Sequence, residues 1–277
     1  MNAVEDAAVE LIRLAATQLP NDVKNSLQKA CGEEATKAGK MGLEAIIENV
    51  RLAEKTGSPL CQDTGIIVFY VKVGDKFDSA VNIPDALRSA VKKATLEVPL
   101  RSNVVDPFSR KNTGDNVGLG MPIINWEFTH GNCLEVTVFL KGAGSENMCT
   151  LTMLHPTAGV AGVKKFVKDA VVHAGGQPCP PTIVGVGIGG SADVAVSLAE
   201  KALLRPANKR NKESRIAELE NELLDAINAT GIGPMGLGGR FTALGVNVEY
   251  AYCHTASLPV AVNIGCWCNR RATVRLK

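Results

Sequence analysis

Three cysteines of this chain stand in settings that suit metal binding. Cys61, Cys179 and Cys266 each lie where a turn rich in Gly or Pro meets an expected strand. Thiolates are soft ligands for iron and zinc, but these three are too far apart in the sequence for the paired C-x-x-C ligands of a zinc ribbon. Three separate cysteines can hold three irons of a [4Fe–4S] cluster and leave the fourth iron open to a substrate. From the residues alone, this cluster is one possibility among several.

Ionisable side chains near these cysteines could supply acid–base chemistry and bind an anion. Asp63 is two residues from Cys61, where a carboxylate can act as an acid or a base, although an Asp in a turn more often bonds to nearby backbone. Arg101 opens a long polar segment, and a fixed guanidinium suits a dicarboxylate. His254 is the only histidine that precedes a Thr-Ala turn near a candidate ligand. Taken alone, it favours a structural role.

The other five cysteines are interpreted as ordinary thiols. Eight cysteines in a chain of 277 residues without a secretory signal favour reduced thiols over a disulfide framework. Cys149 follows a Gly-rich segment and Cys268 is two residues from Cys266, and both rank below the three candidate ligands. The remaining three are expected to be small core residues: Cys31, Cys133 and Cys253.

The composition is that of a globular protein and excludes several classes of function. With 45% hydrophobic residues, the chain can bury a sizeable core, and with only 4% aromatic residues that core must use aliphatic side chains. A net charge of +2 gives no reason to expect binding to nucleic acid or to a membrane surface. The sequence has no apolar run long enough to span a membrane. We therefore expect a cytoplasmic protein with no nucleic-acid or membrane partner.

The first part of the chain, residues 1–57, is expected to be mostly helical. Apolar residues recur at helical spacing over Val4–Leu19, and Pro20 then breaks the pattern. Two further helices are expected over Asn21–Gly39 and Met41–Lys55. These helices come before the turn that carries Cys61.

Short apolar runs follow, and they predict strands separated by helices. The expected strands are Ile66–Val73, Ile123–Phe128, Leu134–Leu140, Thr182–Val186, Leu244–Tyr252 and Val260–Ile264. The expected helices are Asp85–Leu96, Thr157–Ala174, Asp193–Leu204 and Ser214–Ala229. Gly131-Asn132 predicts a hairpin turn between the second and third of these strands. The simplest partition is one α+β domain over residues 1–277, in which an N-terminal helical portion precedes a mixed sheet flanked by helices.

Six segments resemble the iron–sulfur class I fumarate hydratases, in the order that this family has them. They are Ser58–Gly65, Gly142–Asn147, Cys179-Pro180-Pro181, Gly189–Asp193, Gly231–Gly239 and His254–Asn263. The resemblance covers about Ser58 to Arg271 and is closest to the α subunit of the two-subunit form. The α subunit of L-tartrate dehydratase is a near relative.

This resemblance implies a cofactor and a pair of catalytic residues. The positions that match the family's cluster ligands are Cys61, Cys179 and Cys266, so a [4Fe–4S] cluster with one open iron is expected. Asp63 and His254 match its acid–base pair, with His254 also in contact with a substrate carboxylate. The expected reaction is the reversible hydration of fumarate to malate.

The resemblance also implies which residues bind the substrate, a four-carbon dicarboxylate. Gln62, Arg101 and Gly144 match substrate-contacting positions, Gly144 through a backbone amide that a Cβ would obstruct.

The segment Gly187–Ser191 lacks the Lys of a phosphate-binding P-loop and is interpreted as a strand-to-helix turn near the cluster.

A second subunit is expected because the sequence matches only part of the single-chain enzymes. It ends 11 residues after Cys266, whereas single-chain members of the family continue into a domain with a catalytic threonine and further basic residues. By resemblance, a separate β subunit supplies those groups, and the assembly is expected to be α2β2.

Three alternatives remain open at this point. L(+)-tartrate differs little from malate, so an α subunit of tartrate dehydratase fits the same motifs. A non-catalytic iron–sulfur protein would normally use four protein ligands and a closed cluster, and a structural zinc protein would use paired C-x-x-C ligands. The three candidate ligands and their charged neighbours favour an enzyme over both.

Overall fold

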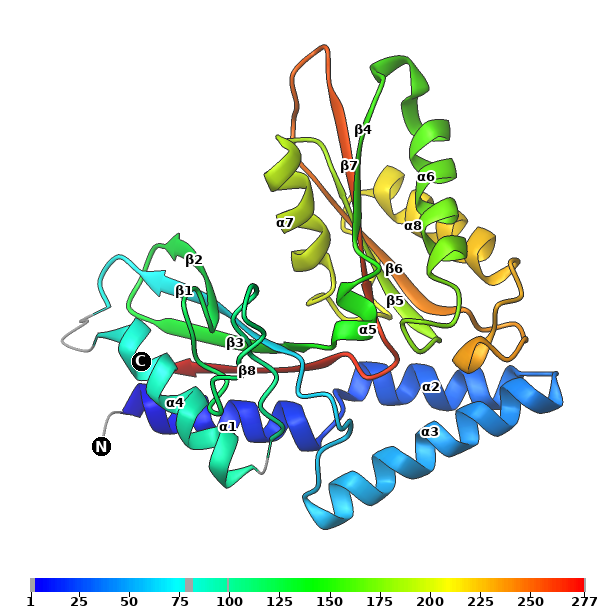
Figure 1. Ribbon diagram of the computed structural model, residues 1–277. Coiled ribbons are helices and arrows are strands. Elements are labelled where there is room, and N and C mark those ends of the chain that lie inside the picture. Colours follow the sequence, from blue (N-terminus) through cyan, green and yellow to red (C-terminus); the bar gives the residue numbers. More distant parts are fainter. Residues whose placement is uncertain (1–2, 78–81, 99, 277) are drawn as a thin grey trace. The chain divides into compact units, whose positions relative to one another are not determined.

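The computed structural model describes residues 3–77, 82–98 and 100–276 of the chain (Figure 1). Its helices are α1 Ala3–Thr17, α2 Asn21–Glu33, α3 Lys37–Thr56, α4 Ile83–Glu97, α5 Ala143–Glu146, α6 Gly159–Ala174, α7 Ala192–Ala202 and α8 Ser214–Asn228. Its strands are β1 Ile66–Gly74, β2 Ile123–Thr129, β3 Leu134–Lys141, β4 Thr150–Leu154, β5 Thr182–Ile188, β6 Ala243–Tyr250, β7 Leu258–Gly265 and β8 Arg270–Leu276. Within the described ranges, no helix combines the length and apolar character that crossing a membrane requires.

The chain folds into two compact units. Unit 1 comprises residues 1–20, 49–143 and 270–277, and unit 2 comprises residues 21–48 and 144–269. Each unit contains a four-stranded sheet with both parallel and antiparallel pairs. The α+β class and the N-terminal helical portion are therefore confirmed, with two mixed sheets flanked by helices. A single domain over residues 1–277 stays a prediction.

Unit 1 packs α1 and α4 against a sheet with the order β2-β1-β3-β8. Side chains alternate along β1, so that Ile67, Phe69 and Val71 share one face and enter the core with the two helices. Ala90 and Ala94 of α4, one helical turn apart, are fully buried in the same core. Small and aliphatic side chains thus build this core in a chain that is poor in aromatic residues.

The predicted hairpin between β2 and β3 is wrong. Both strands pair with β1, β2 in parallel and β3 antiparallel, so β1 lies between them. The chain crosses the end of β1 at Gly131, whose carbonyl accepts a hydrogen bond from the Lys76 N–H at 3.0 Å. Gly131 has a φ of 114°, which glycine adopts readily. The Gly131-Asn132 pattern correctly predicted that the chain reverses direction between β2 and β3. A local pattern of this kind cannot show that another strand, β1, lies between them.

The strand β8 was missed, although its sequence contains a signal. Ala272, Val274 and Leu276 pack against the core of unit 1, while Thr273 and Arg275 between them are exposed. This alternation is the period-two pattern of a half-buried strand. It returns the end of the chain to unit 1, where β8 pairs with β3.

Unit 2 has the sheet order β4-β7-β5-β6, with helices on both faces. Figure 1 shows α6 and α8 on one face and α7 on the other. On the α7 face, a Cβ added to Gly185 would lie 2.1 Å from the Ala199 oxygen, and one added to Gly187 would lie 1.9 Å from the Ala195 oxygen. The glycines of β5 are therefore required for the close approach of α7.

Glu34 joins the end of α2 to the segment before β6, within unit 2. Its carboxylate accepts hydrogen bonds from the N–H and hydroxyl of Thr36 at 2.9 and 3.0 Å and from the N–H groups of Arg240 and Phe241 at 2.8 and 3.3 Å. Burial opposes ionisation, but these four bonds outweigh it and hold the pKa of Glu34 below its ordinary value of 4.5. The stability that ionised Glu34 contributes is thus present above pH 4.5 and is lost as the pH falls through the lower folded-state pKa.

Replacement of Glu34 by Gln is expected to lower the free energy of unfolding by about 2 kcal/mol near neutral pH, because three backbone N–H groups and a hydroxyl lose a charged acceptor. Urea unfolding measures this loss. The difference in free energy of unfolding between the variant and the wild type should become smaller at acid pH. Glu33→Gln is the matched control. Its side chain is 42% exposed and lies 3.7 Å from Arg240, so its loss should cost less than about 1 kcal/mol. Equal losses in the two variants would contradict a special role for Glu34.

Candidate active site

The turn that carries Cys61 is fixed to the helices of unit 1 by the residue before it. Leu60 is buried, its N–H donates to the Ala16 carbonyl at 2.8 Å, and its carbonyl accepts from the Asn49 side chain at 2.9 Å. Further along the turn, Gly65 has a φ of 78°, and a Cβ there would lie 2.5 Å from the Lys141 oxygen. Contacts with α1, α3 and the end of β3 thus fix the backbone on both sides of Cys61.

Three residues predicted from the sequence line one cavity in unit 1. Its volume is about 400 Å³, and its lining includes Cys61, Gln62 and Arg101. The rest of the lining comes from the same two segments: Pro59, Thr64 and Leu100. A half-buried cysteine, a glutamine and an arginine therefore line a single space. A guanidinium and an amide are suitable donors for a carboxylate, and the thiol is a suitable soft-metal ligand.

Asp63, which follows Gln62, is held by hydrogen bonds at both of its carboxylate oxygens. Oδ1 accepts from the Gly65 N–H at 2.8 Å and from the side-chain amide of Asn103 at 2.7 Å. Oδ2 accepts from the Ala143 N–H at 2.8 Å. An ionised carboxylate, which only accepts hydrogen bonds, matches these three donors. The sequence did not single out Asn103, because one asparagine in a polar loop carries no distinctive signal.

Cys179 and Cys266 lie at the same end of the sheet in unit 2. Cys179 comes just before β5 and Cys266 follows β7, and these two strands are antiparallel neighbours. The Trp267 N–H donates to the Cys179 carbonyl at 3.2 Å, so the two segments are in contact. Cys179 has a φ of 53°, a left-handed conformation that is uncommon for a residue with a side chain. The structure thus brings together two of the three predicted cluster ligands.

Gly144 lies at this same end of unit 2. A Cβ added to Gly144 would lie 3.0 Å from the Gln177 oxygen, in the segment that leads to Cys179. This contact leaves little room for a side chain at position 144. It agrees with the expectation that Gly144 acts through its backbone, although the role itself stays a prediction.

His254 lies at the opposite end of β7 from Cys266. It precedes the strand, Cys266 follows it, and the strand has 8 residues, which corresponds to a span of about 25 Å. His254 is exposed, and its Nδ1 accepts from the Ala256 N–H at 3.1 Å. The loop is also tied to the end of β5, where the Gly190 N–H donates to the Tyr252 carbonyl at 3.2 Å. Within unit 2, His254 is therefore not brought to the two cysteines.

The glycine-rich turn after β5 shares the end of the sheet where His254 lies. The predicted strand-to-helix turn is present, because β5 ends at Ile188 and α7 begins at Ala192. Cys179, however, lies before the first residue of β5, so the turn is at the far end of this strand. Within unit 2 the turn is therefore not brought to Cys179 and Cys266, and its place near the cluster stays a prediction. A glycine is needed at position 189 because a Cβ there would lie 1.9 Å from the Ala251 oxygen.

The other cysteines differ in their surroundings, and no disulfide forms among the described residues, which include all eight cysteines. Cys133 and Cys268 are buried, whereas Cys31 is half-buried and Cys253 is exposed. The prediction that Cys253 is a core residue is wrong, because β6 ends at Tyr250 and leaves Cys253 in the loop with His254. Among the described residues, no group of three or more His, Cys, Asp or Glu side chains is arranged to hold a metal ion.

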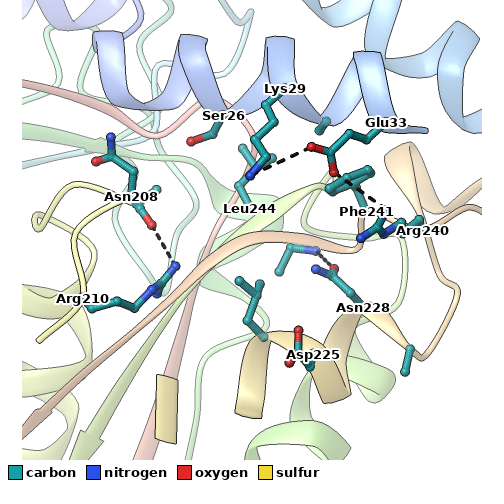
Figure 2. Close-up of a pocket in the computed structure, with 15 residues that line it drawn as sticks. Ser26, Lys29, Glu33, Asn208, Arg210, Asp225, Asn228, Arg240, Phe241 and Leu244 are labelled. Atoms are coloured by element: carbon teal, nitrogen blue, oxygen red, sulfur yellow. Dashed lines mark hydrogen bonds and ion pairs between the residues drawn. The ribbon is translucent and has the colours of Figure 1, made fainter. Parts of the chain in front are cut away.

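A larger cavity in unit 2 contains none of the predicted site residues. It has a volume of about 610 Å³ and lies among α2, α8 and the start of β6 (Figure 2). Glu33 lies 4.0 Å from Lys29 and 3.7 Å from Arg240, and Arg210 donates to the Val246 carbonyl at 2.9 Å. The cationic side chains that line this cavity thus already contact neighbouring protein groups. The cavity in unit 1 is the stronger candidate for binding a substrate.

Comparison with known proteins gives matches over nearly the whole chain. A family model described as fumarate hydratase (Fumerase) matches residues 5–275. A protein of Methanocaldococcus jannaschii named "Putative L(+)-tartrate dehydratase subunit alpha" is 52% identical over 99% of this chain and 98% of its own length. The L(+)-tartrate dehydratase subunit alpha of Escherichia coli strain K12 is 37% identical over 99% of this chain and 91% of its own length. The similarity therefore extends over both units.

Proposed function

Because this chain belongs to the fumarate hydratase family and is a hydro-lyase, we propose that it is the α subunit of an enzyme that reversibly hydrates fumarate to malate. The observation that carries the proposal is the cavity of unit 1, where Cys61, Gln62 and Arg101 meet next to the anchored Asp63. A second candidate reaction is the dehydration of L(+)-tartrate to oxaloacetate. The names of the relatives from M. jannaschii and E. coli favour it.

We assign the binding of a [4Fe–4S] cluster to Cys61, Cys179 and Cys266. All three are half-buried. Cys61 lines a cavity of about 400 Å³, and a backbone hydrogen bond joins the segments that carry the other two. A set of three thiolates fits such a cluster and leaves its fourth iron without a protein ligand. When bound, the cluster supplies a Lewis acid for a substrate hydroxyl.

Asp63 and Arg101 supply charge next to the reacting carbons in this proposal. Hydration adds hydroxide to one alkene carbon and a proton to the other, and negative charge develops on the carboxylate beside the carbon that takes the proton. Arg101 and Gln62 hold one substrate carboxylate through N–H donors. Asp63 acts as the acid or base, or stabilises the group that does so. The backbone amide of Gly144 adds a further contact.

His254 takes part in the reaction from a second copy of the α chain. In its own chain it lies about 25 Å from Cys266, along the length of β7. A four-carbon substrate held near Cys266 cannot reach across that distance. We therefore pair the His254 of one chain with the Asp63 of another, which requires at least two α chains related by symmetry.

A separate β subunit completes the proposed site. Arg101 and His254 account for one carboxylate, whereas a dicarboxylate needs both ends held and access of water controlled. The relatives from M. jannaschii and E. coli are named as α subunits, which supports a second, different chain. We propose an α2β2 assembly in the cytoplasm, with no nucleic-acid or membrane partner.

Turnover by the α chain with and without its β partner tests this function. The partner is obtained by copurification from native cells, and the α chain is purified anaerobically with a reconstituted cluster of about four irons per chain. The α chain alone should show less than about 1% of the activity of the complex, because the substrate contacts that the β subunit supplies are missing. Substantial turnover by the α chain alone would contradict the division of the site between two subunits.

The same experiment decides between the two candidate substrates. Loss of fumarate is followed by its ultraviolet absorbance, and dehydration of L(+)-tartrate is followed by formation of oxaloacetate. The substrate with the higher kcat/KM is the one that the site recognises. If the iron-loaded complex acts on neither compound, the proposed function is wrong.

A further inference from the structure

Asn103 contacts Asp63 and lies outside the six segments that resemble the family. We propose that Asn103 is the positioning residue that holds the carboxylate of Asp63 in its reactive orientation. The proposal rests on the function proposed above, in which Asp63 takes part in acid–base chemistry. It is carried by the hydrogen bond of 2.7 Å from the Asn103 side-chain amide to Asp63 Oδ1.

The three hydrogen-bond donors to Asp63 differ in how far each can fix the orientation of its carboxylate. The Gly65 N–H belongs to the same turn as Asp63, only two residues away, and moves with it. The Ala143 N–H holds the other oxygen from the segment after β3. Asn103 is the donor that uses a side chain, and it comes from a segment 40 residues along the chain. It therefore links the Asp63 turn to the loop that begins with Arg101.

The backbone of Asn103 is fixed independently of Asp63. Its N–H donates to Asn116 Oδ1 at 2.8 Å, and Asn116 Nδ2 donates to the Arg101 carbonyl at 3.2 Å and to Thr95 Oγ1 at 3.1 Å. Asn116 is 1% exposed and has a φ of 60°, a left-handed conformation that Asn tolerates well. Asn116 thus clamps both Arg101 and Asn103 to α4. The backbone of Asn103 is thus held independently of the bond that its side chain makes to Asp63, and such support from neighbouring groups is what preorganisation of a site requires.

This arrangement separates the effect of Asn103 from that of Arg101. Removal of the Asn103 amide leaves the Asn116 clamp and the position of Arg101 in place, so substrate binding should change little. The carboxylate of Asp63 loses one of the two donors to its Oδ1 and is then held only by the backbone N–H groups of Gly65 and Ala143, so we expect its orientation to shift. A catalytic group that is displaced by about 1 Å can lose roughly a hundredfold in rate. The loss should therefore fall on kcat rather than on KM.

The test uses Asn103→Leu in the full complex with the β subunit, because leucine has a similar size but no donor. We expect kcat to fall by about tenfold to a hundredfold, with KM changed by less than about threefold and an unchanged cluster spectrum. Asn103→His should restore part of the activity, because its Nδ1 can donate from the place of the amide nitrogen. Ser102→Ala is the matched control, since Ser102 Oγ donates to Asn112 at 2.7 Å in the same loop without touching Asp63.

A double-mutant cycle decides whether Asn103 acts through Asp63. In the Asp63→Asn background, Asn103→Leu should change kcat by less than about twofold, because the group that it positions is already lost. A full tenfold loss of kcat in the Asp63→Asn background would overturn the proposal. So would a rise in KM for Asn103→Leu that Ser102→Ala shows to the same extent. If the wild-type complex turns over neither substrate, the crystal structure of the Asn103→Leu chain decides instead. An Asp63 carboxylate in its wild-type orientation there would refute the positioning role.

Discussion

Cys61→Ser, Cys179→Ser and Cys266→Ser are each expected to abolish binding of an intact [4Fe–4S] cluster and, with it, all measurable turnover. A serine hydroxyl is nearly the size of a thiol but is a poor ligand for a soft metal site. A cluster with only two protein ligands would have two irons without them, and it should be lost during anaerobic purification. Iron and sulfide content, together with the visible absorption spectrum, measure the loss directly.

Cys149→Ser and Cys268→Ser are the controls for these three variants. Cys149 Sγ lies 3.1 Å from Asn263 Oδ1, and Cys268 is 2% exposed, so both thiols already have packed surroundings in unit 2. The two control variants should keep the cluster and most of the activity. A cluster that survives Cys179→Ser but not Cys149→Ser would show that the ligands have been assigned wrongly.

Hybrid complexes made from two inactive α chains are expected to regain activity. Asp63→Asn and His254→Asn should each lower kcat by roughly two to four orders of magnitude, as loss of an acid–base group does. In a hybrid with one chain of each kind, one of the two sites combines the intact Asp63 of one chain with the intact His254 of the other. That site should restore about half of the wild-type activity in a twofold-symmetric assembly.

Two affinity tags, one on each mutant chain, allow the hybrid to be purified before it is assayed. A hybrid of wild-type and Asp63→Asn chains, made in the same way, checks that one intact site is enough for activity. If His254 served the site of its own chain, every site in the mutant hybrid would contain one substitution. Activity would then stay at the level of the single variants, and the exchange of His254 between chains would be excluded.

Local sequence was sufficient to place most helices and strands. The predicted Asp85–Leu96 and Ser214–Ala229 correspond to α4, Ile83–Glu97, and α8, Ser214–Asn228. Their apolar residues recur with the period of a helix, and this pattern depends only on neighbours within a few turns. The pairing of strands does not follow from such a pattern. β1 separates β2 from β3 because residues more than 50 positions earlier in the chain pair with both.

The candidate site was predictable from the sequence only as a set of residue types. Cys61, Gln62 and Arg101 were chosen by motif and resemblance, and the structure places them around one cavity. The contact of Asn103 with Asp63 and the clamp formed by Asn116 were not predictable. Each depends on the path of a long loop, whose course is set by hydrogen bonds between segments that no short-range pattern relates.

The sequence by itself determined the class of this protein, the candidate residues for its chemistry and the family to which it belongs, because residue type and order along the chain are enough for those conclusions. Only the tertiary structure decided which of these residues meet. It placed Cys179 and Cys266 at one end of adjacent strands and His254 at the other. The physical reason is the rigidity of a strand. Twelve residues that form a tight loop can return to their starting point, whereas an extended segment of 8 residues keeps its two ends about 25 Å apart.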